Sequence, residues 1–343
     1  MVRYEDIETV AEHLEHVPVV DVRSPSEYAR GHVSGAFNLP LFDDEERALV
    51  GTMYHRSGRD ASVITGLDLA GPQLSDKVRQ ARRLVPGGEM ILYCWRGGMR
   101  SAAMAWLFDM AGFRTTVVNG GYKAYRRFVR QSFEVPSALV IIGGMTGSGK
   151  TAVLHALKER GEQVIDLEEL ACHKGSAFGA LGQRHQPPNE QFENDLSAQW
   201  RRMDRSRPVW MEDESQTIGF NRIPEALFSQ MTRSPLILMR VSRDARIRRL
   251  SSEYAAFNPQ LLREAVTRIT KRLGGLNTRK ALEAIEKDDF AKAIEIVLAY
   301  YDKTYSHSLA IRDSQPLWQA ELQDDDPAVH AEMILEYYRH RMC

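Results

Sequence analysis

Gly144-Met-Thr-Gly-Ser-Gly-Lys-Thr151 decides the fold of the second half of this chain of 343 residues. The stretch fits the pattern G-x-x-x-x-G-K-[ST]. It follows an apolar run at 139–143, expected to be a strand, and opens a helix expected over 150–159. This order of strand, glycine-rich loop and helix is typical of a phosphate-binding loop, or P-loop. The sequence therefore predicts an α/β domain that binds phosphate groups at this loop.

The residue types of the loop explain how it would hold a phosphate. Glycines allow successive backbone N–H groups to point inward, Lys150 supplies a positive charge, and Thr151 can hold a magnesium ion when one is bound. The predicted phosphate- or diphosphate-binding residues are Gly144, Gly147, Ser148, Gly149, Lys150 and Thr151. The loop does not say which ester binds, since ATP, a nucleoside substrate and a non-nucleotide diphosphate all offer the same oxygens.

Acidic residues follow another expected strand, at 208–212. Glu212, Asp213 and Glu214 form a candidate acidic site that could hold metal-bound water or orient a substrate group. A solvated acidic strand end is an equally good interpretation. Asp166, after the strand expected at 163–166, is a weaker candidate.

A second loop with chemical character lies earlier in the chain, at Cys94-Trp-Arg-Gly-Gly-Met-Arg-Ser101. It falls between a strand expected at 89–94 and a helix expected at 100–111. Backbone N–H groups and the helix dipole at this position favour a thiolate and any anionic sulfur or selenium attached to it. Arg96 and Arg100 add positive charge, so we predict Cys94, Arg96 and Arg100 as catalytic residues. A buried structural cysteine is the alternative, which the glycines and arginines disfavour.

Length and composition predict two domains in a soluble protein. Of the residues, 43% are hydrophobic and 27% charged, which is enough for real cores, and the chain is longer than one core usually spans. Apolar runs are only strand-sized and the first ten residues lack the features of a signal peptide, so we expect a cytoplasmic protein with no membrane partner. Three widely spaced cysteines predict neither a disulfide framework nor a metal site.

The pattern of apolar runs predicts the domain organisation. Strands are expected at 18–22, 89–94 and 115–118 in the first third, alternating with helices, which is typical of a parallel sheet. We expect one domain at 1–134 and a P-loop domain at 137–343, with a mostly helical region from about Tyr254 onward. The segment 174–189 reads as a long functional loop.

Arginines are concentrated in the second domain. Arg240, Arg243, Arg246 and Arg249 are candidate contacts for a nucleic-acid backbone, because a spacing of three residues can place the last three along one helical face. A solvated basic helix is about as good an interpretation. A second basic cluster, at 268–272 and 279–280, favours a nucleic-acid patch.

Three stretches between residues 21 and 125 resemble the rhodanese sulfurtransferases. Residues 94–101 are similar to the active-site loop of that family. Residues 21–40, which begin Asp-Val-Arg-Ser-Pro, resemble its amino-terminal signature, and Asn119-Gly-Gly-Tyr-Lys-Ala-Tyr125 its closing signature, with Tyr where many members have Trp. The resemblance implies that Cys94 carries a persulfide or its selenium counterpart. It also implies that Asp21 and Arg23 brace the fold and the site.

A rhodanese domain followed by a P-loop domain resembles the bacterial tRNA 2-selenouridine synthases over essentially the whole chain. The stretches 167–179, 208–219 and 272–277 also look like blocks of that family. The resemblance implies a fold of a rhodanese-like parallel sheet domain followed by a P-loop NTPase-like α/β domain with a helical C-terminal region.

The same resemblance implies a reaction on the wobble uridine of tRNA. The 2-thio group of 5-methylaminomethyl-2-thiouridine is first alkylated by geranyl diphosphate, and selenium from selenophosphate then replaces the S-geranyl group. We assign the first step to the P-loop domain and the second to Cys94. The implied partners are tRNA, geranyl diphosphate and selenophosphate, together with the synthase that supplies selenophosphate. No tightly bound cofactor is implied, and magnesium dependence stays open.

Several points stay open at the level of the sequence. The walls of a prenyl groove are not defined, although Phe178, Phe192, Trp200 and Phe220 are candidates. One alternative function is a rhodanese sulfurtransferase fused to an ATP-dependent kinase. Another is a P-loop NTPase with a regulatory rhodanese module, which the intact cysteine loop disfavours. The identity of the tRNAs and the oligomeric state are also open.

Overall fold

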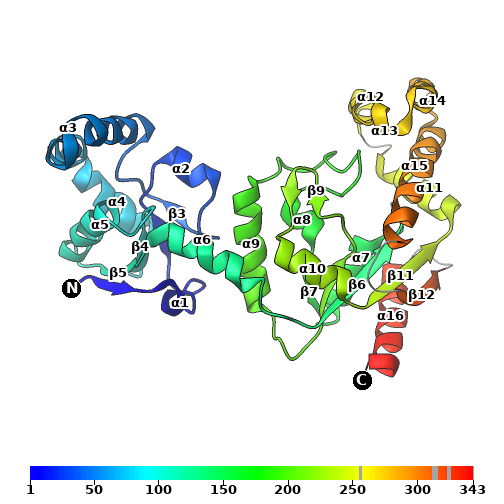
Figure 1. Cartoon of the computed structure of the whole chain (residues 1–343), viewed down its shortest axis with the longest axis horizontal. Helices are drawn as coiled ribbons and strands as arrows, with labels where there is room; N and C mark the ends of the chain where they lie inside the picture. The colour runs from blue at the N-terminus through cyan, green and yellow to red at the C-terminus, as the bar shows by residue number, and fades with distance from the viewer. Residues whose placement is uncertain (255–256, 311–315, 323–325, 343) are drawn as a thin grey trace. The chain divides into compact units, whose positions relative to one another are not determined.

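The computed structural model describes residues 1–254, 257–310, 316–322 and 326–342 (Figure 1). It divides into two compact units, which are described separately. The N-terminal unit comprises Met1–Ser132 and Glu193–Ala198, and the C-terminal unit comprises Phe133–Phe192 and Gln199–Cys343.

A parallel sheet forms the centre of the N-terminal unit. Its spatial order is β1 (Arg3–Glu5), β5 (Arg114–Val118), β4 (Glu89–Tyr93), β2 (Val19–Asp21) and β3 (Phe37–Asn38). Four of the five residues of β4 are buried, as expected for a strand covered on both faces. This unit has the parallel sheet that the sequence predicts.

Helices cover both faces of this sheet and close its core. They are α1 (Ile7–Val10), α2 (Pro25–Arg30), α3 (Asp44–Ala70), the 3₁₀ helix η1 (Gly71–Gln73), α4 (Leu74–Leu84), α5 (Met99–Met110) and α6 (Gly121–Ser132). Met90 and Leu92 of β4 pack in one apolar cluster with Met104 and Phe108 of α5. The loop between β4 and α5 is therefore anchored on both sides by buried residues.

The C-terminal unit is built on a second parallel sheet. Its order is β12 (Pro316–Leu322), β11 (Leu236–Val241), β6 (Leu139–Gly144), β8 (Val209–Glu212) and β7 (Gln163–Val164). A small antiparallel pair, β9 (Thr217–Ile218) with β10 (Asn221–Arg222), follows β8. Because β6 lies in the middle of the sheet, its carboxyl end is flanked by the ends of β8 and β11.

The expectation of a mostly helical C-terminal region missed β12. This strand pairs in parallel with β11 along its whole length, from Leu236 opposite Pro316 to Val241 opposite Leu322. Whether this segment becomes a strand depends on the open edge of β11, which is far away in the sequence. Local periodicity therefore gave no signal for β12.

Ten helices of the described chain belong wholly or partly to the C-terminal unit. They are α7 (Lys150–Glu159), α8 (Leu167–Ala171), α9 (Asn189–Arg202), α10 (Glu225–Arg233), α11 (Arg243–Tyr254), α12 (Pro259–Arg268), α13 (Thr270–Leu273), α14 (Gly275–Glu286), α15 (Phe290–Ala310) and α16 (Pro327–Met342). Helix α7 packs against α16, and both contribute to the apolar cluster around Trp210. Among the described residues, no helix is both long enough and apolar enough to cross a membrane.

A separate apolar cluster joins the helices α11 to α15. Leu250 and Tyr254 of α11 pack with Leu262 of α12 and with Ile285 and Ile294 of α14 and α15. Figure 1 shows these helices gathered at one end of the C-terminal unit. This helical subdomain therefore has a core distinct from that of the sheet.

Candidate functional site

Cys94 lies directly after β4, at the carboxyl end of a central strand. Its side chain is almost fully buried, and its sulfur accepts a hydrogen bond of 3.3 Å from the backbone N–H of Gly98. The hydroxyl of Ser101, in the first turn of α5, lies 3.3 Å from the same sulfur. The loop thus wraps the sulfur with polar hydrogens at the start of a helix, as the sequence predicts for an anionic sulfur or selenium group.

Close backbone contacts hold the cysteine loop against the turn that precedes α6. The N–H of Tyr122 donates to the carbonyl of Cys94 at 2.9 Å, and that of Lys123 donates to Trp95 at 3.0 Å. Gly97 has φ +63°, and a Cβ at this position would lie 2.5 Å from the carbonyl oxygen of Val118. Only glycine fits there, which explains why a glycine stands in the loop and why a second motif at 119–125 accompanies it.

The two arginines of the loop have different surroundings. Arg100 donates hydrogen bonds of 2.5 and 3.3 Å to the carboxylate of Glu27 on α2, and its side chain is 20% exposed. Arg96 is exposed. Arg100 is therefore committed to an ion pair within the protein, and Arg96 is the arginine whose charge faces solvent.

Asp21 and Arg23 brace the site from the neighbouring strand β2. The Arg23 guanidinium donates to Asp21 at 2.6 Å and to the carbonyl of Gly31 at 2.6 Å, and it lies 3.9 Å from the ring centre of Tyr122. Both side chains are fully buried. A buried, fully bonded ion pair of this kind fixes the backbone around a site, in line with the structural role expected for it.

The P-loop connects β6 to α7, as the sequence predicts. A turn at its start is closed by the hydrogen bond from the N–H of Ser148 to the carbonyl of Met145, at 3.0 Å. The first N–H groups of α7 have no acceptor within the helix, so they point toward a ligand position beside the loop. Gly149, with φ +83°, lies so close to the guanidinium of Arg249 that any side chain would collide with it. Glycine at this position therefore admits an arginine from α11 to the loop.

Ser148 contributes to the loop through its backbone. Its side chain is buried, and a Cβ on Gly144 would lie 2.5 Å from the Ser148 hydroxyl oxygen. The hydroxyl is thus packed against the end of β6. Of the predicted phosphate-binding residues, Lys150 and Thr151 are the two whose side chains reach other polar groups of the site.

Lys150 and Thr151 face carboxylates from two other elements. The Lys150 ammonium donates to the carbonyl of Gly144 at 3.1 Å and lies 4.0 Å from a carboxylate oxygen of Glu214. The Thr151 hydroxyl donates to Glu168 of α8 at 2.8 Å. A lysine and two carboxyl groups therefore meet at the mouth of the P-loop.

Comparison with known proteins assigns the chain. Residues 137–333 match the family described as the tRNA 2-selenouridine synthase AAA domain, and residues 6–128 match the rhodanese-like domain. The tRNA 2-selenouridine synthase of Marinobacter nauticus is 34% identical over 89% of this chain and 91% of its own length. Those of Shewanella frigidimarina (32%, covering 90% and 93%) and Cupriavidus pinatubonensis (34%, covering 86% and 89%) are similar to the same extent.

The chain belongs to the tRNA 2-selenouridine synthase family. The resemblance inferred from the motifs is confirmed, and so is the fold class of a rhodanese-like domain followed by a P-loop domain with a helical C-terminal region. The hydrogen bonds described above for the two loops are therefore those of a member of this family.

The acidic residues at the end of β8, Glu212 to Glu214, have different surroundings. Glu212 is fully buried, and one of its oxygens accepts a hydrogen bond of 2.8 Å from the N–H of Glu168. Asp213 accepts a hydrogen bond of 2.9 Å from the hydroxyl of Tyr305, which also accepts one of 2.9 Å from the N–H of Gly144. Asp213 therefore supports the end of β6, whereas Glu212 and Glu214 lie beside the P-loop side chains.

Burial makes these carboxyl groups unusually weak acids. It raises the pKa of Glu214 to about 8, with nearby Lys150 opposing the rise and Glu168 adding to it. Burial, with the nearby carboxylates of Asp166 and Glu168, holds the pKa of Glu212 well above its ordinary value. Burial also raises the pKa of Glu168, against the effect of Lys150. With a pKa of about 8, Glu214 is mostly neutral at pH 7, which reduces its repulsion of an anion bound at the loop.

Oxygen donors that suit a magnesium ion surround Thr151. Besides the Thr151 hydroxyl and Glu168, the second oxygen of Glu212 is buried with no hydrogen-bond partner among the described residues. Hydroxyl and carboxylate oxygens are the ligands that magnesium prefers, so the residues present fit such an ion.

One other group of side chains has ligand atoms within reach of a common metal among the described residues: His155, Asp166 and Glu169. Asp166 caps α8 by accepting from the N–H of Glu169 at 2.7 Å, and its other oxygen lies 2.8 Å from His155. These bonds give Asp166 a structural role at the start of α8.

The expected arginine face on α11 is partly wrong. Arg246 has only 4% of its side chain exposed, and it donates to Asp302 at 2.8 and 2.9 Å. It also donates to the P-loop carbonyl of Thr146 at 3.2 Å. A buried, doubly bonded guanidinium cannot reach a nucleic-acid backbone, so Arg246 is removed from the candidate tRNA contacts.

The three other arginines of that set have separate positions. Arg249 donates to the P-loop carbonyl of Gly147 at 3.3 Å. Arg240 lies 3.7 Å from Glu321 of β12, and Arg243 donates to the carbonyl of Glu295 at 3.0 Å, and both are about half exposed. Arg249 thus belongs to the P-loop, while Arg240 and Arg243 stay candidates for a tRNA surface.

Glu168, Arg249 and Tyr305 are the residues of the site whose roles sequence reasoning missed. Glu168 stands two positions after Asp166, the acidic residue that ends the expected strand at 163–166, and this is the one local signal available. Nothing in the sequence near Tyr305 points to the P-loop, because 161 positions separate it from its partner Gly144.

Proposed function

We propose that this chain replaces sulfur by selenium at C2 of the wobble uridine 5-methylaminomethyl-2-thiouridine in tRNA. The P-loop domain alkylates the thio group with geranyl diphosphate, and the rhodanese domain delivers selenium from selenophosphate through Cys94. The observation that carries this proposal is sequence identity of about one third along nine-tenths of both this chain and the tRNA 2-selenouridine synthases, with both domains matched.

In the first step the 2-thio sulfur attacks C1 of the geranyl group. A carbon–sulfur bond forms, the carbon–oxygen bond to diphosphate breaks, and N3 of the base releases its proton. Lys150 and the first N–H groups of α7 would hold the departing diphosphate, whose charge they offset. Arg249, beside Gly149, would add a second cation.

Magnesium would bind together with the diphosphate in this step. Thr151, Glu168 and Glu212 would hold it, and it would supply further positive charge to the leaving group. The protein side chains would then act on the prenyl diphosphate mainly by orientation and charge.

In the second step the selenium of selenophosphate, held at the Cys94 loop, attacks C2 of the alkylated base. The carbon–selenium bond forms, the carbon–sulfur bond breaks, and geranylthiol leaves with a proton. Water then cleaves the selenium–phosphorus bond and phosphate is released. The N–H of Gly98 and the hydroxyl of Ser101 would stabilise the anionic selenium group at the end of β4. The exposed Arg96 would attract selenophosphate.

The tRNA backbone would lie against exposed cations of the helical subdomain. Arg268, Lys271, Arg272, Arg279 and Lys280 are all exposed on α12 to α14, unlike Arg246. Such cations position a nucleic acid without reading its sequence. Arg240 and Arg243 would extend this surface along β11 and α11.

Mass spectrometry of tRNA tests the proposal. Substrate tRNA is incubated with the protein, geranyl diphosphate and selenophosphate, and the modified nucleosides are identified. We expect 2-selenouridine from the wild type, accumulation of the S-geranyl base with Cys94→Ala, and unchanged thiouridine with Lys150→Ala.

Matched variants separate these roles from general damage. Cys172→Ala removes the other described cysteine, at the end of α8, and Lys158→Ala removes an exposed lysine of α7. Both should give 2-selenouridine as the wild type does. Unchanged tRNA with wild-type protein, together with hydrolysis of ATP, would favour the fused kinase instead.

A further inference from the structure

Helix α15 reaches the P-loop at two points that lie one helical turn apart. Asp302 accepts two hydrogen bonds from the Arg246 guanidinium, at 2.8 and 2.9 Å, and Arg246 also donates to the carbonyl of Thr146 at 3.2 Å. Three residues after Asp302, the Tyr305 hydroxyl accepts from the N–H of Gly144 at 2.9 Å. Residues three apart are neighbours on a helix surface, so one face of α15 is turned toward the P-loop.

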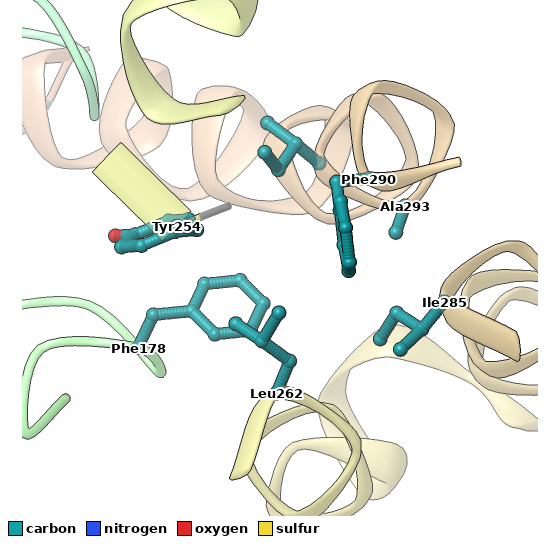
Figure 2. A pocket seen from close by; sticks show the side chains of 7 residues that line it. Phe178, Tyr254, Leu262, Ile285, Phe290 and Ala293 are labelled. Carbon is teal, nitrogen blue, oxygen red and sulfur yellow. The ribbon is translucent and has the colours of Figure 1, made fainter. Parts of the chain in front are cut away.

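The apolar core of the helical subdomain supports this arrangement. Figure 2 shows Leu262 of α12, Ile285 of α14 and Phe290 of α15 gathered around one small apolar space. Leu250 of α11 belongs to the same cluster, and a Cβ on Gly147 would lie 2.9 Å from its side chain. The P-loop therefore rests against a packed group of helices that includes both α11 and α15.

Tyr305 acts on Lys150 through Gly144. The N–H of Gly144 donates to Tyr305, and its carbonyl accepts from the Lys150 ammonium at 3.1 Å. The Tyr305 hydroxyl donates its own hydrogen to Asp213 at 2.9 Å, so its oxygen serves as the acceptor for Gly144. A Cβ on Gly143 would lie 2.7 Å from this oxygen, and glycine there leaves room for it. The position of the carbonyl that holds Lys150 thus depends on a hydroxyl from α15.

Arg246 acts on the N–H of Gly147 through the Thr146 carbonyl. That N–H and that carbonyl belong to one peptide group, and no described peptide bond is cis. A trans peptide directs its C=O and N–H to opposite sides, so the bond from Arg246 turns the N–H of Gly147 away from the guanidinium. This N–H has no backbone acceptor among the described residues. It is therefore a donor that an anion at the loop can accept.

We propose that Tyr305, Arg246 and Asp302 are positioning residues for the phosphate site. Tyr305 sets the carbonyl that holds Lys150. Arg246, oriented by Asp302, sets the direction of the Gly147 N–H. This inference rests on the proposed function, and it assigns to the diphosphate site side chains that act from behind the loop. Arg246 thus serves the P-loop in place of the nucleic-acid contact that the spacing of the arginines suggested.

Phosphorus NMR titration of the full chain with inorganic diphosphate, which also measures weak binding, tests Tyr305. Tyr305→Phe removes the hydroxyl and keeps the ring, so we expect the affinity to fall about fivefold. In the Lys150→Ala background the same change should cost less than about twofold, because the hydroxyl acts through Lys150. Tyr300→Phe, which removes the hydroxyl of a half-buried tyrosine on the same helix, is the matched control and should bind as the wild type does.

Arg246→Lys and Asp302→Asn test the second attachment. Lysine keeps the charge on a single nitrogen, which cannot bond Asp302 and Thr146 together as the guanidinium does. Each variant should bind inorganic diphosphate about fivefold more weakly, and the double variant should lose little more, because Asp302 acts through Arg246. Lys303→Ala removes an exposed charge beside Asp302 and is the control. Asp302→Asn keeps this test available when Arg246→Lys does not fold.

Thermal melting of every variant separates positioning from stability, and affinities are compared at a temperature where all variants are folded. Folded Tyr305→Phe and Arg246→Lys proteins that bind diphosphate as tightly as the wild type overturn the positioning roles, whatever their melting temperatures, and leave the proposed function standing. An equal loss from Tyr305→Phe with and without Lys150 also overturns the role of Tyr305. A wild-type protein that binds no diphosphate, or whose binding ignores Lys150→Ala, overturns both proposals. A loss that disappears in the Lys150→Ala background supports the inference.

Discussion

The hydroxyl of Thr151 donates a hydrogen bond of 2.8 Å to the carboxylate of Glu168, which joins the first turn of α7 to α8. Glu168 is in turn connected to β8, because its N–H donates to Glu212 at 2.8 Å. The P-loop threonine is therefore connected through Glu168 to the end of β8.

Double-mutant analysis tests this connection. We expect Thr151→Val and Glu168→Gln each to weaken magnesium-dependent binding of diphosphate about tenfold. The double variant should lose little more than either single one, because both side chains would serve one ion. Binding measured with and without magnesium checks this, and Lys158→Ala on the exposed face of α7 is the control. Fully additive losses would show that the two residues act independently.

Diphosphate binding should depend on pH through Glu214. Its carboxyl group, with a pKa of about 8, is mostly neutral at pH 7 and becomes negative above pH 8, next to Lys150. A bound anion raises this pKa further, so binding takes up a proton at high pH. Affinity should then fall by up to tenfold per pH unit above 8.

Glu214→Gln should remove this pH dependence and tighten binding at pH 9 while changing it little at pH 6. Titration of the affinity between pH 6 and pH 9.5 in both proteins provides the measurement. The same slope in both proteins would assign the titration to another group.

The buried carboxyl of Glu212 should also affect stability. Its pKa in the folded protein is well above its ordinary value of 4.5, so the folded state holds more protons than the unfolded state between these two pH values. The free energy of unfolding therefore decreases as pH rises through this window. Glu212→Gln keeps the acceptor for the Glu168 N–H and cannot ionise. We expect its gain in melting temperature over the wild type to be larger at pH 8 than at pH 5, and an equal difference at both would contradict the assignment.

Two adjacent glycines offer a matched test of the cysteine loop. Gly97→Ala would place a methyl group 2.5 Å from the Val118 carbonyl at φ +63°, whereas a Cβ on Gly98 meets nothing within 4 Å. We expect Gly97→Ala to cost about 1–3 kcal/mol of stability and to slow selenium transfer at least tenfold, with geranylation intact. Gly98→Ala keeps its N–H and should be close to wild type. Chemical denaturation and the tRNA assay together check both variants, and equal behaviour of the two would contradict the packing argument.

Arginines of the C-terminal unit should separate into stabilising and tRNA-binding groups. Arg246→Ala leaves the partly exposed carboxylate of Asp302 without its partner, and should cost about 1–3 kcal/mol of stability. Lys271→Ala and Arg272→Ala remove exposed charges and should leave stability unchanged. Each should weaken tRNA binding and reduce the slope of log affinity against log salt concentration by about one. Exposed Lys287→Ala, outside both basic clusters, is the control. Salt-independent losses with Lys271→Ala and Arg272→Ala would exclude them from the tRNA surface.

Local sequence was sufficient for much of the architecture. The expected strands at 139–143 and 89–94 and the helix at 150–159 are present, because apolar periodicity and glycine-bearing turns are encoded within each segment. Strand β12 was missed since its pairing with β11 depends on a distant open edge.

The sequence by itself determined the family and the positions of the two loops, because each loop needs particular residues at fixed local spacing between a strand and a helix. Only the tertiary structure decided which side chains share each site. It placed Glu168, Arg249 and Tyr305 at the P-loop and buried Arg246 against Asp302. The physical reason is that burial, ion pairing and pKa depend on neighbours brought together by packing over long separations. No local pattern encodes those neighbours.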